Sequence, residues 1–423
     1  MSATVTAVRP RRSLTLRASV DATDRRVRRR IYITYGLFYF NTLTFYSGMS
    51  VLHIPGVVGK GLQQAALPAG LLMALSLNRK VVIRPNVFLS LVSLLVVGTF
   101  ITTMQPEHFG TVFRTFRLAE FAVGLWLLTP WWGRRDLLLV RCHLTALSVV
   151  LGSVILGLIV APHRARNEGR LVGAIWPIQS TQVAHYAAVL AGLVVVLWFC
   201  GYLRGRTTAF AAVVAIALLI LTHTRSALFA LIAGLLVAGL SLVVVQTRVR
   251  RLFAVAGAVI AVAVMTLSSF ITTWLERGQS AQGLENLTGR TKVWGPLLAA
   301  PRDKFQEIFG FGLSNVSFNG LPIDSNWLAS YEEQGLLGVV LCATILVFLL
   351  VAAYFQPRGV QRALALLLVT YCLVALFTEV GFTDVSPYLL DLFVAASLLV
   401  PAAAENGGVT GWRHAQIPAA SRP

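Results

Sequence analysis

One arginine in this chain lies in an unusual place and could bind a phosphorylated substrate. Residues 207–246 are almost wholly apolar, yet the stretch Leu-Thr-His-Thr-Arg-Ser at Leu221–Ser226 places His223 and Arg225 in their middle. An arginine held at the centre of a bilayer costs at least about 2.5 kcal/mol. At a membrane surface, in contrast, a guanidinium group can take phosphate oxygens in a bidentate way. Arg225 is therefore the first candidate for binding an anionic group.

Three further segments contain polar residues that could act with Arg225. The segment 161–179 is rich in arginine, 287–298 contains the sequence Gly-Arg-Thr-Lys-Val-Trp, and 310–338 contains a run of acidic and amide side chains. The candidate binding or reacting residues in these segments are Arg164, Arg166, Arg170, Arg290, Lys292, Trp294, Asp324, Asn326 and Glu333. Glu379 and Asp384 flank a later turn and could line the same site.

Each of these residues also has an ordinary structural interpretation. Arg225 could anchor a helix at the membrane interface, Arg290 could be a solvated loop charge, and His223 could stabilise a turn. Asp324 could cap the helix that follows it. Trp294 could pack or anchor at the interface, and Glu332 and Glu333 could pair with a loop arginine.

The composition indicates a membrane protein made of helices. The chain has 423 residues, of which 56% are hydrophobic and only 13% are charged, whereas a soluble protein has about 25% charged residues. The apolar residues form blocks of about the length that crosses a hydrocarbon core as a helix. The net charge of +19 comes from short basic clusters between these blocks, which is typical of loops that stay on the cytoplasmic side. We therefore expect no nucleic acid partner.

The hydropathy pattern predicts an all-α fold with twelve transmembrane helices. The spans are predicted at 31–53, 60–78, 86–104, 115–132, 140–161, 180–202, 207–222, 226–246, 251–274, 335–355, 362–382 and 386–402. Every second junction, counted from the amino terminus, contains at least two basic residues. The positive-inside rule then places both termini in the cytoplasm, and the turn at Arg225 on the outer side.

The predicted organisation has five parts. A basic cytoplasmic tail at 1–30, expected to be disordered, precedes spans one to nine at 31–274. A large external loop at 275–325 follows, with amphipathic helices expected near 291–300 and 301–309. Spans ten to twelve occupy 326–402, and a second disordered tail occupies 403–423. The four cysteines lie in or beside apolar spans without a CxxC pair, so neither a disulfide nor a metal site is expected.

The order of these motifs resembles the bacterial O-antigen ligase and O-antigen polymerase superfamily. The likeness consists of an Arg-Ser turn between two spans, the Gly-Arg-Thr-x-x-Trp element at Gly289–Trp294, the Gly-Phe-Gly turn at Gly310–Gly312, and Glu-Gln-Gly-Leu-Leu-Gly at Glu333–Gly338. It covers about residues 205 to 345. The earlier spans match that superfamily only in number and hydropathy.

The resemblance implies a metal-independent membrane glycosyltransferase without a cofactor. Its donor would be an oligosaccharide on undecaprenyl pyrophosphate, and its acceptor would be a hydroxyl of a glycan or lipid-linked glycan at the outer face of the cytoplasmic membrane. Arg225, Arg290 and one of the arginines of 161–179 would stabilise the pyrophosphate as it leaves. A flippase and a chain-length regulator would be its partners in building a polysaccharide of the cell envelope.

The chain departs from the ligase pattern at the position of the general base. Ligases have a His-Asn pair before the span that follows the loop, whereas Asp324 and Ser325 align there, or Asn326 aligns with the Asn after a shift of one residue. Asp324 could act as the base if partial burial makes its carboxylate more basic. This departure favours polymerisation or transfer of an exopolysaccharide over ligation to lipid A core.

A transporter or flippase of lipid-linked saccharides is the alternative, because twelve spans with both ends inside are common among transporters. The sequence shows no repeated halves and no paired spans broken by Gly or Pro. Few ionisable residues are expected near the middle of the membrane, where coupling sites of transporters lie. These features favour the enzyme.

Overall fold

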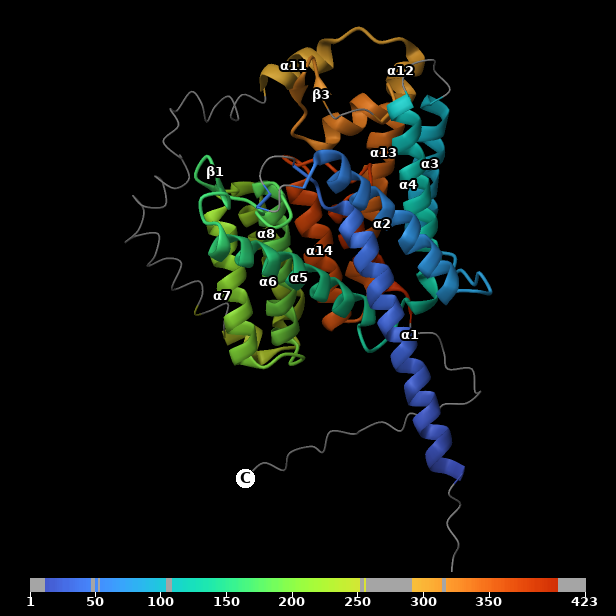
Figure 1. The fold of residues 1–423 in the computed structure, drawn as a ribbon, viewed down its shortest axis with the longest axis vertical. Helices are drawn as coiled ribbons and strands as arrows, with labels where there is room; N and C mark the ends of the chain where they lie inside the picture. Colours follow the sequence, from blue (N-terminus) through green and yellow to red (C-terminus); the bar gives the residue numbers. More distant parts are fainter. Residues whose placement is uncertain are drawn as a thin grey trace, which may run out of the picture.

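The computed structural model describes residues 12–46, 50–51, 54–103, 109–251, 255, 291–313 and 317–401. In these ranges the chain is mostly helical, and its strands form two short antiparallel hairpins. Figure 1 shows the long helices gathered in a bundle, with the helices labelled α11 and α12 at its upper end. The amino-terminal half of α1 projects from the lower end.

The helices follow the predicted apolar blocks closely in position. The longer ones are α1 (Arg12–Thr42), α2 (Gly56–Leu77), α3 (Val87–Thr102), α4 (Phe109–Leu127), α5 (Leu138–Val160), α6 (Ser180–Phe199), α7 (Gly205–Leu221), α8 (Arg225–Val243), α13 (Asn326–Phe355), α14 (Val360–Ala375) and α15 (Pro387–Leu399). The short elements are a 3-10 turn at Thr129–Trp131, α11 (Thr291–Ala299), α12 (Lys304–Phe309), β1 (Arg166–Asn167), β2 (Arg170–Leu171), β3 (Ser317–Phe318) and β4 (Leu321–Pro322).

Four helices in the described part of the chain are long and apolar enough to cross a membrane. They are α5, α6, α8 and α13, and four shorter apolar helices, α3, α7, α14 and α15, accompany them. Large apolar side chains such as Val149, Phe210, Leu240 and Val347 are exposed on the outer faces of these helices. This arrangement fits a helical membrane protein, in which such faces contact lipid.

The predicted count of twelve spans is not supported. α15 has 13 residues, which at roughly 1.5 Å per residue gives about 20 Å, less than the ~30 Å of a hydrocarbon core. The predicted span 362–382 is longer than the helix it contains, because α14 ends at Ala375 and the apolar residues after it form a loop. Hydropathy does not separate such loops from helices. Almost all of the predicted span 251–274 lies outside the described residues.

The predicted tails and loop differ in part from the structure. α1 begins at Arg12, so the segment 1–30, expected to be disordered, is helical from that residue onward. α11 and α12 occupy the places where amphipathic spacing indicated short helices. α12 starts with a capping box in which the Asp303 carboxylate accepts from the Gln306 amide. Residues 275–290 and 403–423 lie outside the described ranges.

Basic junctions between helices meet at the end of the bundle opposite α11 and α12. Arg84, between α2 and α3, donates to the carbonyl of Trp132, just before α5, at 3.0 Å. Arg28 of α1 forms an ion pair with Asp136 at 3.3 Å in the same region. We call this the basic end, and we call the end with α11 and α12 the cap end (Figure 1).

The helices α6, α14 and α15 form the centre of the bundle, because most residues of each are buried. α8 packs closely against α14 at Gly234, where a Cβ atom would lie only 2.9 Å from the carbonyl oxygen of Leu367. Small residues allow helix backbones to approach each other in membrane proteins. Close helix contacts of this kind hold the centre of the bundle together.

A kink in α13 brings the cap onto the bundle. Gly335 has φ 63° and ψ −159°, a conformation that is essentially restricted to glycine. A Cβ atom at Gly335 would also lie 2.5 Å from the backbone of Ile308 in α12. The backbone amides of Phe311 and Gly312 donate to the carbonyls of Glu332 and Glu333 beside this kink. The Gly-Phe-Gly and Gly-Leu-Leu-Gly motifs therefore meet in space.

We expect Gly335→Ala to destabilise the protein by about 2–4 kcal/mol, because the substitution adds backbone strain and a steric clash with α12. The measurement is the thermal unfolding midpoint of the purified protein in detergent. Gly152→Ala in α5 is the matched control, since a Cβ atom there meets nothing within 4 Å. Equal midpoints for the two variants would contradict the role given to the kink.

Candidate functional site

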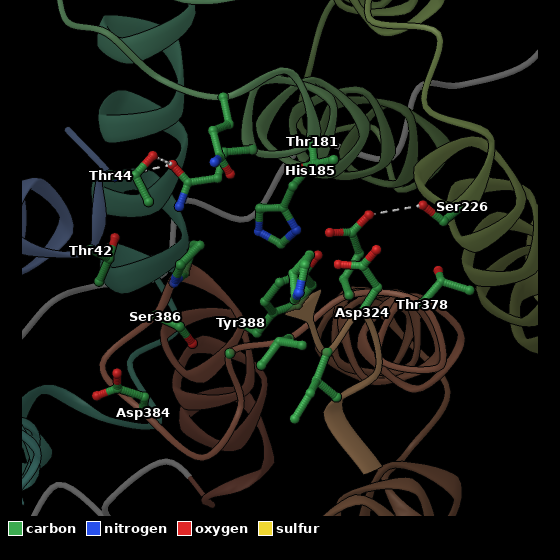
Figure 2. Close-up of a pocket in the computed structure, with 18 of the residues that line it drawn as sticks. Thr42, Thr44, Thr181, His185, Ser226, Asp324, Thr378, Asp384, Ser386 and Tyr388 are labelled. Atoms are coloured by element: carbon green, nitrogen blue, oxygen red, sulfur yellow. Dashed lines mark hydrogen bonds between the residues drawn. The ribbon is translucent and has the colours of Figure 1, made fainter. Parts of the chain in front are cut away.

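A cavity of about 1290 Å³ lies near the cap end, among the ends of several helices. Its walls come from the end of α1, the starts of α4, α6 and α8, strand β2, the segment before α13, and the loop between α14 and α15. Figure 2 shows His185 near the middle, with Thr42 and Thr44 on one side and Ser226, Thr378 and Asp324 on the other. The volume is large enough for a saccharide or a comparable polar ligand.

Arg114 of α4 joins two acidic side chains in the cavity wall. Its guanidinium group lies 2.6 Å from the carboxylate of Asp384 and 3.3 Å from that of Glu333. Glu333 is 1% exposed and lies two residues before the kink at Gly335. A buried carboxylate without a compensating charge is strongly unfavourable. Arg114 therefore fixes α4, α13 and the loop after α14 relative to one another.

Asp384 is held in its charged form by its surroundings. Burial alone raises the pKa of Asp384, but the charges of Arg114 and Arg117, together with hydrogen bonds from Arg114 and the Val385 amide, outweigh burial and hold the pKa below its usual value. The backbone amide of Val385 also donates to this carboxylate, at 2.7 Å. A depressed pKa stabilises the fold above the unfolded pKa of about 4, and this contribution is lost as pH falls below it.

Two further arginines, Arg170 and Arg225, belong to the turn region between α7 and α8. Arg170 of β2 donates to the carbonyl of Thr222 at 3.0 Å and to the hydroxyl of Thr224 at 3.1 Å. These two bonds fix its guanidinium group beside the residue that precedes Arg225. Burial lowers the pKa of Arg170, while the negative charges of Glu379 and Glu168 raise it. The turn therefore presents two cations from segments far apart in the sequence.

Glu379 adds a negative charge to the same side of the cavity. It accepts a hydrogen bond from Ser226, the second residue of α8, at 3.2 Å, and Figure 2 shows this contact. The ionised side chains in the whole lining are balanced, since four arginines, Arg114, Arg117, Arg170 and Arg225, accompany four carboxylates, Asp324, Glu333, Glu379 and Asp384. The formal charges of the lining therefore cancel, and its net charge alone attracts no ion.

Neutral hydrogen-bonding groups line the opposite side of the cavity. Thr44 donates from its hydroxyl to the Gln182 side chain at 2.7 Å, and its backbone amide donates to the same oxygen at 3.1 Å. The other neutral polar residues of the lining near the ends of α1 and α2 and the start of α6 are Thr42, Gln63, Gln179 and Thr181. Amide and hydroxyl groups of this kind can bind several hydroxyls of one sugar.

A buried chain of titratable side chains starts at the cavity wall. His185 of α6 lines the cavity, and its Nε2 lies 3.2 Å from one carboxylate oxygen of Asp391 in α15. Nε2 of His143 in α5 lies 2.9 Å from the other oxygen of Asp391. The Tyr35 hydroxyl lies 2.7 Å from Nδ1 of His143. The two histidines and Asp391 are at most 2% exposed.

Four of the predicted site residues line the cavity together. They are Arg170, Arg225, Asp324 and Glu333, which come from three separate regions of the sequence. Glu379 and Asp384, suggested as members of the same site, line it as well. Arg290 lies outside the described residues, so its position relative to the cavity stays a prediction.

Other predicted site residues do not line the cavity. Arg164 donates to the carbonyl of Ser50 at 2.9 Å, and Arg166 is exposed on β1. Lys292 is exposed on α11, whereas Trp294 packs against the small cap core with Val293 and Leu297. His223 has φ 52° within the turn between α7 and α8, beside the cavity-lining residues.

The structure places Asp324 and Asn326 in different surroundings. Asp324 lines the cavity and is exposed, whereas its predicted role as a base relies on partial burial. It is also not the cap of α13, because Ser325 occupies that position and makes no capping bond with its side chain. Asn326 is buried and accepts from the backbone amides of Gly381 and Phe382 at 3.2 and 2.9 Å. Asn326 therefore holds the loop that lines the cavity.

Arg114, Arg117 and the histidine–aspartate chain were not predicted as site residues from the sequence. His143, His185 and Asp391 each stand as an ionisable residue within a predicted span, and such residues are functional candidates by default in membrane proteins. The expectation of few ionisable residues near the middle of the membrane gave no weight to these three. Arg114 precedes the predicted fourth span by one residue, where an arginine has the ordinary interpretation of an interface anchor.

Comparison with known proteins adds no family to this geometry. A scan of protein-family models and a search of curated proteins find no match to the sequence. In the described part of the chain, no group of three His, Cys, Asp or Glu side chains has the arrangement to hold a metal ion. The groups of the cavity that can do chemistry include its arginines, its carboxylates, its neutral amides and His185 in its wall.

We expect Arg114→Met to lower the free energy of unfolding by about 3–5 kcal/mol, because Glu333 then loses a charge partner in a buried place. Thermal unfolding in detergent measures the effect. Adding Glu333→Gln to this variant should restore part of the stability, since the buried charge is removed. Arg206→Met, at an exposed position at the start of α7, is the control. Equal losses of stability in Arg114→Met and Arg206→Met would contradict the role given to Arg114.

Proposed function

We propose that this protein is a membrane glycosyltransferase of the O-antigen ligase and polymerase type. It would transfer or polymerise a glycan from undecaprenyl pyrophosphate onto an acceptor hydroxyl, for an exopolysaccharide or another cell-surface polysaccharide. The observation that carries the proposal is the convergence of Arg170 and Arg225 with carboxylates and neutral amides in one cavity. Arg225 is also the residue on which the motif resemblance centres.

The arginines suit a reaction in which a pyrophosphate leaves. Negative charge accumulates on the phosphate oxygens as the bond to the sugar breaks, and preorganised cations at that position lower the barrier. The two contacts of Arg170 with the turn hold its guanidinium group in place before substrate arrives. In the proposal Arg170 and Arg225 take the pyrophosphate oxygens, and Arg290 adds a third cation from the segment before α11.

The paired charges of the cavity are compatible with this role. A cavity with unpaired arginines would be costly in an apolar bundle, whereas Glu379 near the turn offsets the cost until an anionic ligand arrives. The neutral side, with Thr44 and Gln182, would bind sugar hydroxyls without competing for the pyrophosphate. This division of groups supports a substrate with one anionic and one neutral polar part.

We place the protein in the bacterial cytoplasmic membrane with its cap end outside. The basic end contains Arg28, Arg84 and Arg134, so the positive-inside rule puts that end in the cytoplasm. Residues 400 and 401 contact Gly133 at the same end, and the carboxyl-terminal tail would start there. The cavity would then open to the outer face, where flipped lipid-linked donors arrive.

A transporter of lipid-linked saccharides is the second candidate, and one observation favours it. Asp391 with His143 and His185 is an ionisable cluster inside the bundle, and such clusters form proton relays in transporters. The two candidates differ in a covalent step, because only the enzyme makes a new glycosidic bond. Product analysis therefore separates them, whereas substrate binding does not.

We expect the wild-type protein in liposomes to lengthen or transfer an undecaprenyl-pyrophosphate oligosaccharide, and Arg225→Ala to lower the rate roughly 10²–10³-fold. Arg170→Ala should lower the transfer rate by a similar factor, because it removes the neighbouring cation. The readout is the product ladder, followed by gel or mass spectrometry with donors of several sugar compositions.

The control is Arg206→Ala, an exposed arginine at the start of α7, which should keep the wild-type rate. Wild-type rates in both Arg225→Ala and Arg170→Ala would remove the proposed mechanism. Movement of the intact donor across the membrane without any new glycosidic bond would favour the transporter instead.

A further inference from the structure

The chain from His185 to Tyr35 has no role in the function proposed so far, although it touches the cavity. Four titratable side chains from α6, α15, α5 and α1 follow one another at separations of 3.2, 2.9 and 2.7 Å. Asp391 stands between the two histidines and is fully buried. A cluster of this kind needs an explanation, because isolated charges are unfavourable inside an apolar bundle.

Helix packing explains only part of the arrangement. The contacts of Asp391 tie α15 to α5 and α6, which stabilises the centre of the bundle. A histidine serving only as a tie has no need to lie in a cavity wall. His185 does lie there, and its Nδ1 is buried with no hydrogen-bond partner among the described residues, whereas its Nε2 lies within ion-pair distance of Asp391 but outside hydrogen-bond geometry. An unpartnered buried nitrogen at a cavity wall is a position for a ligand group.

The geometry resembles the way enzymes orient a basic histidine. In such sites a carboxylate contacts one ring nitrogen, fixes the tautomer and stabilises the imidazolium that forms when the other nitrogen takes a proton. Here Asp391 lies at Nε2 of His185, so Nδ1 is the nitrogen available to accept a proton. His143 holds the second oxygen of Asp391, and Tyr35 lies at the far nitrogen of His143.

We propose that His185, positioned by Asp391, is the general base that takes the proton of the acceptor hydroxyl. The inference rests on the proposed glycosyl transfer. The acceptor O–H bond breaks as the oxygen forms its bond to the anomeric carbon, the proton goes to Nδ1 of His185, and the pyrophosphate leaves with the electron pair of the broken C–O bond. His143 and Tyr35 are positioning residues behind Asp391.

This assignment replaces Asp324 as the base. Asp324 is exposed on the segment that follows β4, whereas His185 is buried with the Asp391 carboxylate at its Nε2. In Figure 2 the His185 side chain lies between Thr44 on one side and Ser226 on the other. That position suits a group that must reach the acceptor while the donor occupies the arginines.

Three tyrosine rings, from α6, α14 and α15, lie around the His185 ring. The rings of Tyr371 in α14 and Tyr388 in α15 lie 5.3 and 4.3 Å from the His185 ring, and the ring of Tyr186 lies 5.5 Å away. Asp391 is the charged group in contact with the ring. The chemistry of the ring therefore depends mainly on Asp391, which makes the pair testable.

The test compares His185→Gln with Asp324→Asn in the reconstituted transfer assay, with donor affinity measured separately for each variant. Glutamine can still donate a hydrogen bond to Asp391 but cannot accept a proton at this position. We expect His185→Gln to lower the transfer rate roughly 10²–10⁴-fold while the donor affinity stays within a few-fold of wild type. Asp324→Asn should lower the rate less than His185→Gln.

Two further measurements separate a base from a structural residue. Added imidazole should restore part of the transfer rate to His185→Ala and should not restore Arg225→Ala, because only the first variant lacks a proton acceptor. Asp391→Asn should lower the rate with little change in donor affinity, and thermal unfolding would show whether the variants are folded. His143→Gln should have a smaller effect, since it changes the far side of Asp391.

The outcomes distinguish this inference from the function on which it rests. Absence of any product from the wild type with matched donors overturns both. Product from the wild type together with a near wild-type rate in folded His185→Gln overturns only the assignment of the base. A large loss in Asp324→Asn with a retained rate in His185→Gln would return the role of base to Asp324.

Discussion

The need to pair every buried charge determines how this bundle is built around its cavity. Arg114 contacts both Glu333 and Asp384, and Asp391 stands between His143 and His185. A partner removed from such a site leaves an unfavourable buried charge, so each cluster holds together the helices that supply it. The two clusters tie α4 to α13 and α5 to α6 and α15. The same contacts that stabilise the bundle therefore place functional groups in the cavity wall.

Glycine residues allow the helix backbones to approach closely, and the charged clusters form only when they do. The kink at Gly335 turns the first part of α13, with Glu333, toward Arg114, and it packs against α12 where a larger residue has no room. Gly234 lets α8 approach α14 in a similar way, which brings the start of α8 beside the loop after α14. In the sequence, the Gly-Leu-Leu-Gly motif looked like a family signature. In the structure, its first glycine, Gly335, is required because a side chain there would clash with the backbone of α12.

The sequence predicted the class of fold and part of the site for reasons that can be traced to particular residues. Hydropathy placed the helices because their apolar blocks are long. It counted the loop at 376–382 as part of a span because Leu376, Phe377, Val380 and Phe382 are hydrophobic, although Glu379 lies among them. Arg225 and Arg170 were found as arginines at apolar boundaries. Arg114 was missed because the partners that reveal it, Glu333 and Asp384, are 219 and 270 residues away. His185 and Asp391 could have been predicted, because each is an ionisable residue inside a predicted apolar span.

The balance of charge in the cavity bears on the kind of chemistry it can perform. A site that binds a permanent anion by net charge would hold its product as firmly as its substrate. Here the arginines already have acidic neighbours, so their preference for a ligand is small until negative charge grows on that ligand. Catalysis depends on interactions that become stronger in the transition state than in the ground state. A balanced, preorganised cavity near a carboxylate-oriented histidine meets that requirement better than a cluster of unpaired cations would.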